Sequence, residues 1–426
     1  MIEAGSHVVV VGGGAAGLSA ARVIARRHRV TLVEAEPRLG GHAWTWRVPD
    51  GPDEGLPLDL GFMVLNDRNY PAMHEMLGQL GGLEVANTEM SFGFWDEAAN
   101  FGFLVNGPPG GAALDDPRFR DLLKHILRFR SRALRDLATD AVGDDTLGGY
   151  LERHGVPAVV AEDYLLPMGA AIWSTAPGDL RRYPAQAFLA FFHHHGLLSL
   201  EAPPQWQHLR GGSCRYVEAL LAATPDLNLV HERAARLFRS ATGVTLELAD
   251  GAQVSADYAV VATHADQALG LLAEPTPLER LGLAPWTYQT NHAVLHTDEQ
   301  AMPPRAYWGC WNARRRTGAQ AQPSLAFTYY LNRLQNHAAA ARNYFLTLAA
   351  DPADLPELAD DTTLLRTTFR HPVFSRAAMA GARRLDDFDA CGQARTFFCG
   401  SYFGYGFHED AIRSGARMAE PFGPGG

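Results

Sequence analysis

A run of four valines and the glycine-rich turn after it limit the fold of this 426-residue chain more than any other segment. The valines at 8–11 predict a strand buried on both faces, as in the middle of a parallel sheet. The chain then reads Gly12-x-Gly14-x-x-Gly17 and continues in an alanine-rich helical pattern. Gly12 permits the tight turn, Gly14 lets a pyrophosphate approach the backbone, and Gly17 allows the helix to pack closely on the strand. The N-terminus of this helix offers free N–H groups to phosphates.

A second strand and an acidic residue complete this pattern. The strand is predicted at 30–33 and ends at Glu34, twenty residues after Gly14. An acidic side chain at this spacing accepts hydrogen bonds from the ribose hydroxyls of an adenosine. A glycine fingerprint alone is a weak signal, because glycine turns also serve packing. Here the strand, turn, helix, second strand and acid follow one another in the required order, so we predict a dinucleotide site.

Length, composition and charge narrow the class of protein. The chain is long enough for two domains and a large core. No apolar run reaches the roughly eighteen residues that cross a bilayer, and no secretory signal is expected before the first strand. The four cysteines form no Cys-x-x-Cys pair, so neither a disulfide framework nor a metal site is expected. We therefore expect a cytoplasmic protein, and the net charge of −10 argues against nucleic acid as a partner.

The residues after Glu34 carry a resemblance to a known family. Arg38 and the glycine pair Gly40–Gly41 follow the acid, and a further strand is expected at Asp59–Gly61. This segment resembles the flavoprotein pattern of the amine oxidase and phytoene desaturase superfamily. In that superfamily the arginine and the glycine pair lie along the FAD pyrophosphate, and the later glycine lies beneath the flavin. The resemblance implies FAD as the cofactor, bound non-covalently because no cysteine stands at the position used for attachment.

The resemblance covers essentially the whole chain and implies its domain organisation. The fold class is α/β combined with α+β: a Rossmann-like FAD-binding domain of the amine-oxidase type with an inserted substrate domain. The FAD-binding domain is expected to be discontinuous, at 1–90, 205–266 and 385–426. The substrate domain is expected at 91–204 and 267–384.

The family likeness also implies which residues contact FAD. A last strand and a loop at the flavin edge lead into a final helix whose N-terminus faces the N1–C2=O edge of the flavin. Reduction builds up negative charge at that edge, which a helix N-terminus stabilises. The implied cofactor contacts are Gly12, Gly14, Ala15, Ala16, Gly17, Glu34, Ala35, Arg38, Gly40, Gly41, His42, Gly61, Phe62, Ala234, Thr263, Gly400, Ser401, Phe407, His408 and Ala411.

Three strings, at 164–174, 262–269 and 404–411, are similar to one bacterial branch of this superfamily, described as NAD/FAD-binding or amine-oxidase-like proteins. Some relatives are linked with fatty-acid modification, including desaturation of methyl-branched acyl chains. The segment 164–199 has few charges and suits the lining of an apolar cavity, although ordinary core has the same composition. Our leading hypothesis is an FAD-dependent oxidoreductase that dehydrogenates an apolar, fatty-acyl-like substrate by hydride transfer to flavin N5.

Such a reaction also needs a base that removes a proton from the neighbouring carbon. The candidate bases are His408, Glu409 and Tyr405, with His195 as a further candidate. The residues expected to line the substrate part of the cavity are Trp173, His195, Trp308 and Trp311. His195 ends a run of three histidines that would point in different directions on a helix, so no metal is expected there.

One departure from the superfamily pattern bears on the reaction. Amine oxidases carry a lysine near the start of the strand expected at 291–296, where this chain has Asn291 and His292. This difference weakens the interpretation as an amine oxidase. The alternatives to the leading hypothesis are a redox-neutral FAD-dependent isomerase of double bonds, an amine or amino-acid oxidase, and a non-catalytic flavoprotein scaffold.

A helix expected at 119–137 bears an unusual number of basic side chains for an acidic protein. Across 118–137, seven Arg and Lys residues on its polar face stand against two aspartates. A basic face of this kind is simply solvated, or it contacts an anionic membrane surface or an acidic acyl carrier. Contact with a membrane surface would place the protein peripherally at the inner face of the membrane. A hairpin is expected over 90–105 with its turn near Asn100, and the sequence leaves the oligomeric state open.

Overall fold

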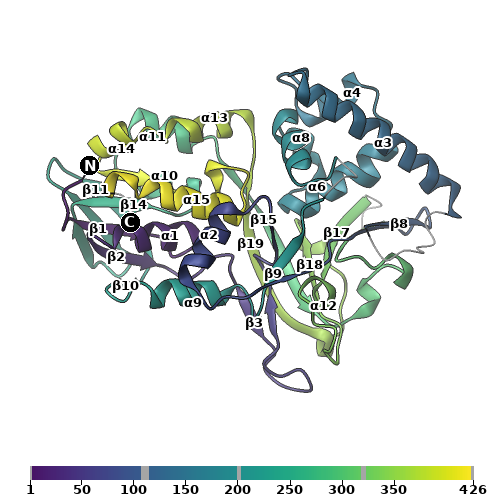
Figure 1. Cartoon of the computed structure of the whole chain (residues 1–426), viewed down its shortest axis with the longest axis horizontal. Coiled ribbons are helices and arrows are strands. Elements are labelled where there is room, and N and C mark those ends of the chain that lie inside the picture. The colour runs from purple at the N-terminus through teal and green to yellow at the C-terminus, as the bar shows by residue number, and fades with distance from the viewer. Residues whose placement is uncertain (1, 107–114, 199–202, 318–322, 424–426) are drawn as a thin grey trace.

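The computed structural model describes residues 2–106, 115–198, 203–317 and 323–423. Figure 1 shows a parallel sheet and a larger, mainly antiparallel sheet side by side, each with its own covering helices. Among the described residues no helix is both long and apolar enough to cross a membrane.

The parallel sheet carries the glycine-rich turn. Its five strands follow the order β10-β2-β1-β14-β20, and all neighbours are parallel. The bounds are β10 Asn228–His231, β2 Arg29–Glu34, β1 His7–Val11, β14 Tyr258–Val261 and β20 Thr396–Phe398. Val8, Val9 and Val10 on the central strand β1 are completely buried, as expected for a strand covered on both faces. The Rossmann-like α/β fold predicted from the sequence is therefore confirmed.

Helix α1 (Ala15–Ile24) follows the turn after β1 and packs against the last long helix, α15 (His408–Met418). A Cβ atom on Gly17 would lie 1.9 Å from the backbone oxygen of Gly12, so only glycine lets the helix approach the turn this closely. Gly12 itself has φ of +106°, a left-handed conformation that favours glycine.

The larger sheet has seven strands in the order β19-β15-β18-β17-β16-β7-β8. Their bounds are β19 Thr363–Val373, β15 Thr287–His296, β18 Phe345–Ala349, β17 Pro323–Tyr330, β16 Trp311–Thr317, β7 Phe92–Asp96 and β8 Phe101–Val105. Strands β7 and β8 form the predicted hairpin, with Asn100 at φ +44° in its turn. This hairpin joins the sheet through a parallel pairing of β7 with β16. Segments more than 200 residues apart in the sequence therefore share one sheet.

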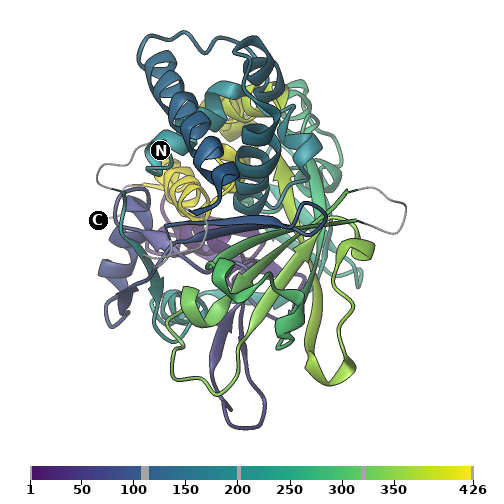
Figure 2. The same cartoon turned by 90° about the vertical axis from the view of Figure 1, so that its right-hand side faces the viewer.

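Helices gather at one side of this sheet, as Figure 2 shows in blue and teal. They include α3 (Pro117–Ala138), α4 (Leu147–Arg153), α6 (Leu166–Trp173) and α8 (Ala185–His194). Helix α3 is the predicted basic helix, and its N-cap Asp116 accepts the N–H of Arg118 at 2.8 Å. Its apolar residues, among them Phe119 and Ile126, are buried against the protein, so its basic face is the exposed one.

Smaller elements complete the fold. They are β3 (Thr45–Arg47) with β4 (Pro57–Asp59), β5 (Leu65–Asn66) and β6 (Val85–Asn87) with β9 (Trp206–Leu209), the sheet of β11 (Ala234–Arg239), β12 (Val244–Leu248) and β13 (Gln253–Ala256), and helices α2 (Pro71–Leu80) and α9 (Cys214–Ala222).

The expected domain boundaries at 267 and 384 need a correction. Helices α11 (Pro277–Leu283) and α13 (Arg376–Arg384) fall within the range assigned to the substrate domain, but they lie beside the parallel sheet (Figure 1). Glu279 of α11 forms an ion pair with Arg239 of β11 at 2.5 Å, which ties the helix to the FAD-binding part. The strands β15–β19 of the larger sheet, in contrast, do lie where the substrate domain is expected.

Candidate active site

A cavity of about 1200 Å³ lies between the two sheets. Val11 and Glu34, at the carboxyl ends of β1 and β2, line it from the parallel sheet. Trp311, Tyr329 and Phe369 line it from the seven-stranded sheet. Open α/β sheets bind their ligands at the carboxyl ends of the strands, so the cavity has the position expected of a dinucleotide site.

One end of the cavity is a cradle of backbone. Gly14 is the N-cap of α1 and provides no side-chain cap, so the first N–H groups of the helix lack a capping side chain. A Cβ atom added to Gly14 would meet nothing closer than Gly41 at 4.0 Å, which shows that the turn opens onto the cavity. The Glu34 carboxylate accepts the N–H of Gly13 at 2.6 Å and of Glu36 at 2.8 Å, which fixes the acid beside the turn. Open N–H groups at a helix N-terminus fit the diphosphate of a dinucleotide.

The structure gathers the predicted cofactor residues around this one cavity. Gly17 is the exception: it does not line the cavity but provides the close packing described above. The predicted residues that line it are Gly12, Gly14, Ala15, Ala16, Glu34, Ala35, Arg38, Gly40, Gly41, His42, Gly61, Phe62, Ala234, Thr263, Gly400, Ser401, Phe407, His408 and Ala411. They come from six separate segments of the chain.

His408, at the first position of α15, is held by two aromatic side chains. Its ring stacks on Phe62 with centroids 3.9 Å apart and an interplanar angle of 9°. Its Nε2 lies 3.0 Å from the hydroxyl of Tyr216. Burial, with a smaller contribution from His42, lowers the pKa of His408 to about 3, so the ring is neutral at physiological pH.

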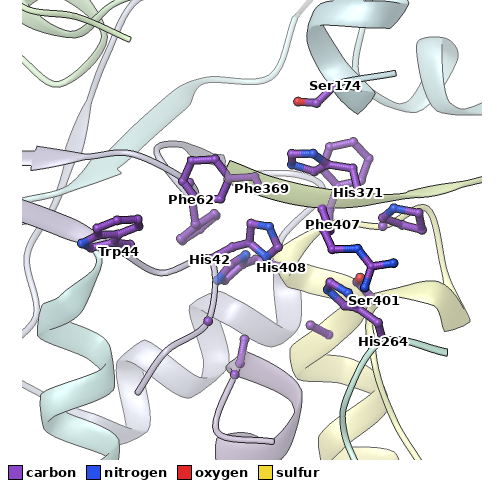
Figure 3. Close-up of a pocket in the computed structure, with 18 of the residues that line it drawn as sticks. His42, Trp44, Phe62, Ser174, His264, Phe369, His371, Ser401, Phe407 and His408 are labelled. Atoms are coloured by element: carbon purple, nitrogen blue, oxygen red, sulfur yellow. The ribbon is translucent and has the colours of Figure 1, made fainter. Parts of the chain in front are cut away.

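Three further histidines lie in the cavity wall, as Figure 3 shows. The centroid of the His42 ring lies 5.3 Å from that of His371 and 6.3 Å from that of His264. Burial lowers the pKa of His42 to about 4 and that of His264 to about 3, and the pKa of His371 falls well below its ordinary value. Sequence reasoning missed His264 and His371 as site residues. His264 stands within the 262–269 string, which is a usable signal, whereas nothing local marks His371.

Glu409 requires a correction, because its carboxylate serves another element. It accepts the N–H groups of Ala72 and Met73, both at 3.0 Å, at the start of α2. The side chain is buried and is not part of the cavity lining. Glu409 therefore caps a helix and does not face a substrate, which removes it as a candidate base.

Three other side chains with predicted roles at the substrate do not reach the cavity. Trp173 packs against Phe191 and Phe407 and donates its Nε1–H to the backbone oxygen of Tyr405 at 3.2 Å. Neither Trp173 nor Tyr405 lines the cavity. Trp308 packs elsewhere, against Phe345 and Tyr330, and donates to the backbone oxygen of Pro303. The roles expected for these three side chains in direct contact with a substrate are therefore wrong.

His195 and Trp311 do line the cavity. The His195 ring stacks on Phe191 with centroids 3.8 Å apart. Its Nδ1 lies 3.0 Å from the backbone oxygen of Phe191, which only accepts, so Nδ1 carries the hydrogen and Nε2 keeps a free lone pair. Burial lowers the pKa of His195 to about 4.

The part of the cavity lining that three segments contribute is uncharged and mostly apolar. The described lining from the 60–106, 168–206 and 311–348 segments includes no Lys, Arg, Asp or Glu. The apolar side chains there are Leu60, Phe62, Met63, Val64, Met90, Phe92, Val105, Met168, Ala171, Ile172, Phe191, Leu197, Trp206, Trp311 and Leu348.

Asn291 occupies the strand where amine oxidases place a lysine. Its amide nitrogen donates to the backbone oxygen of Ser174 at 2.7 Å and to Nδ1 of His371 at 2.9 Å. Lys124, the one lysine of the chain, is exposed on α3 and does not line the cavity. Within the described part of the chain, no cluster of His, Cys, Asp or Glu side chains could hold a metal ion.

Comparison with known proteins identifies the family. A model of the flavin-containing amine oxidoreductases matches residues 15–421, so the chain belongs to that family. An L-amino-acid oxidase from Siganus canaliculatus is 27% identical over 296 residues, 65% of this chain and 53% of that protein. A 15-cis-phytoene desaturase from Narcissus pseudonarcissus is 38% identical over 202 residues, 42% of this chain and 33% of that protein. The chain thus spans about half or less of the length of these curated relatives.

Among solved structures, the CLA-producing fatty acid isomerase from P. acnes aligns with a TM-score of 0.70. The alignment covers 99% of this chain and 100% of that one at 14% identity, which demonstrates a common fold. The family match supports FAD as the cofactor, as the sequence predicts.

Proposed function

We propose that the protein dehydrogenates an apolar, fatty-acyl-like substrate and leaves a carbon–carbon double bond in it. The observation that carries this proposal is the uncharged part of the cavity lining. Transfer of an apolar chain into such a space is favourable, whereas an ammonium or carboxylate group would lose its hydration without gaining an oppositely charged partner. The relatives named a phytoene desaturase and a fatty acid isomerase give the proposal further support.

FAD, when bound, supplies the acceptor for the hydride that leaves the substrate. The chain itself supplies the binding and the proton transfer. Phe62, Phe407 and Trp206 contribute large apolar surfaces to the lining, which favour an apolar chain over water. His195 is the proposed base, because its Nε2 is an unprotonated acceptor within the lining, whereas the carboxylate of Glu409 caps α2. A neutral imidazole in a dry site can take the proton from the carbon next to the one that loses hydride.

Anaerobic reduction of the FAD-loaded protein tests this function. Flavin absorbance is followed with saturated straight and methyl-branched acyl esters, with amines, and with amino acids. Bleaching by acyl esters, with an unsaturated product found by mass spectrometry, is the expected result. Bleaching by amines or amino acids alone contradicts the proposal. Movement of a double bond in an unsaturated ester without bleaching also contradicts it, and establishes an isomerase instead.

Replacement of His195 tests its role. H195Q is expected to slow flavin reduction at least about a hundredfold, the usual contribution of a general base, without changing the FAD content. H193Q is the matched control, because His193 is exposed on the same helix, α8. Equal reduction rates in the two variants would rule out His195 as the base.

A further inference from the structure

The contact between Asn291 and His371 fixes the chemical character of one point in the cavity wall. Ser174 ends α6 in a left-handed conformation, with φ of +49°, and its backbone oxygen meets the Asn291 amide at 2.7 Å. A backbone oxygen only accepts hydrogen bonds, so the amide must present its NH₂ group to Ser174. The same nitrogen lies 2.9 Å from Nδ1 of His371. Nδ1 of His371 is therefore the acceptor in this contact.

This assignment determines whether the other ring nitrogen of His371, Nε2, carries a hydrogen. A neutral imidazole has one acceptor and one donor nitrogen, so Nε2 carries the hydrogen when Nδ1 accepts. Burial and the neighbouring His42 and His264 hold the pKa of His371 well below its ordinary value, which keeps the ring neutral. His371 lines the cavity, and no other described side chain or backbone group makes a hydrogen bond with its Nε2. A donor without a partner therefore stands in the wall of a largely apolar cavity.

Two arginines in the same cavity lining, Arg370 and Arg38, already have hydrogen-bond partners. The Arg370 guanidinium, next to His371 on β19, pairs with Asp266 at 2.5 Å. Arg38, beside His42, donates to the backbone oxygen of Gly41 at 2.7 Å. A fixed, uncharged N–H donor in such surroundings matches a neutral oxygen acceptor better than a carboxylate, whose charge would remain uncompensated.

We propose that Nε2–H of His371 binds the carbonyl oxygen of an acyl ester, thioester or amide, so that the substrate is an acyl derivative and not a hydrocarbon or a free carboxylate. This inference rests on the proposed function, because it assumes that an apolar chain occupies the cavity. Asn291 acts as a positioning residue: it holds the ring in the tautomer that donates into the cavity.

Binding measurements separate this inference from the function on which it rests. The FAD-loaded protein is titrated with a medium-chain methyl ester, the matched S-methyl thioester, the free acid and the matched alkane, and the flavin difference spectrum gives each Kd. The ester and the thioester are expected to bind about tenfold more tightly than the alkane, as one hydrogen bond allows. The free acid is expected to bind more weakly than the ester at neutral pH. H371F should remove the preference for the ester and leave the Kd of the alkane unchanged, and H371Q, which keeps an N–H donor, should retain part of it.

Infrared spectroscopy of the bound ester reports on the hydrogen bond in the wild-type protein itself, so this measurement does not require a variant that folds. The carbonyl stretch of a carbon-13-labelled ester is expected at lower frequency in the wild-type cavity than in an apolar solvent, because the oxygen accepts a hydrogen bond. Asn291→Leu should weaken that shift while the ring is still present. Trp311→Phe tests the alternative donor, because Nε1 of this lining residue also lacks a partner; the shift should persist in this variant.

The outcomes are distinct. If neither ester nor alkane binds, the proposed function fails. If both bind equally to the wild type, if the free acid binds best, or if the carbonyl shift is absent, the His371 subsite is refuted while the apolar cavity stands. If W311F and not H371F removes the preference, the donor is Trp311 and the assignment to His371 is overturned.

Discussion

Substitution of Glu409 distinguishes the structural role described here from the catalytic role that its position in the sequence suggests. The N-cap of α2, Tyr70, makes no side-chain capping bond, and the first turn of that helix has no acidic residue. The buried carboxylate of Glu409 serves as the cap of this helix instead, because it accepts two backbone N–H groups of its first turn at 3.0 Å. Hydrogen bonds to a charged group contribute about 1.5–3 kcal/mol each to stability. Loss of both in E409A should therefore lower the free energy of unfolding by about 3–6 kcal/mol.

E409Q retains one acceptor oxygen but presents an NH₂ group to the other backbone N–H. We expect it to lower the free energy of unfolding by about 2 kcal/mol, which urea unfolding of the FAD-loaded protein would measure. Its rate of anaerobic flavin reduction, measured well below the unfolding midpoint, should stay within about threefold of wild type. E420Q, at an exposed glutamate of the same terminal segment, serves as the control. Wild-type stability combined with a large loss of flavin reduction in E409Q would refute this assignment.

Three further predictions concern other parts of the molecule. Gly17→Ala should abolish FAD uptake or lower the melting temperature sharply, because the new Cβ would lie 1.9 Å from the backbone oxygen of Gly12. The flavin content after purification and a thermal melt measure these two effects. Burial raises the pKa of Asp59 to about 6 from an ordinary 3.8, so its neutral form is favoured by the fold. The contribution of Asp59 to the free energy of unfolding should be complete below about pH 4 and should fall by about 3 kcal/mol as the pH rises through 6. Urea unfolding at a series of pH values measures this dependence, and D59N should remove it. The prediction that the basic face of α3 contacts a membrane is tested with vesicles rich in phosphatidylglycerol. Substitution of the exposed Lys124 and Arg128 by glutamate should abolish vesicle binding, and equal binding of the wild type and this variant would contradict the prediction.

The parts of the fold that could be predicted are those that local sequence determines. The valine strand, the glycine turn, the helix after it and Glu34 follow one another within about thirty residues, and each has a physical signature of its own. Helix α3 likewise shows its apolar period directly in the sequence. The family resemblance then extended the cofactor site to segments as distant as Gly61 and Phe407, which the structure brings to the same cavity.

The errors concern directions of side chains that only tertiary packing decides. His408 and Glu409 are adjacent in α15, and neighbouring helical positions point about 100° apart, so one faces the cavity and the other α2. Trp308 precedes β16 and turns toward Phe345, whereas Trp311 begins that strand and lines the cavity. Sequence position gave the neighbourhood of these residues but not their orientation.

The contact of Asn291 with His371 could not be predicted because it joins two strands eighty residues apart. It depends on the antiparallel register of β15 and β19, in which Gln289 lies opposite His371 and Asn291 opposite Phe369. The two side chains are diagonal neighbours in that register, and no periodicity within either strand reveals the pairing.

The most direct test of the central claim is a single turnover without oxygen. The FAD-loaded protein is mixed with a saturated acyl methyl ester, unlabelled or perdeuterated along its chain, and flavin bleaching is followed together with the mass of the product. If the protein dehydrogenates apolar chains, its flavin should bleach with the ester and should bleach more slowly with the deuterated ester. The product should be an ester that has lost two hydrogens. An FAD-loaded protein that stays oxidised with every acyl ester, yet is bleached by an amine, would contradict the account.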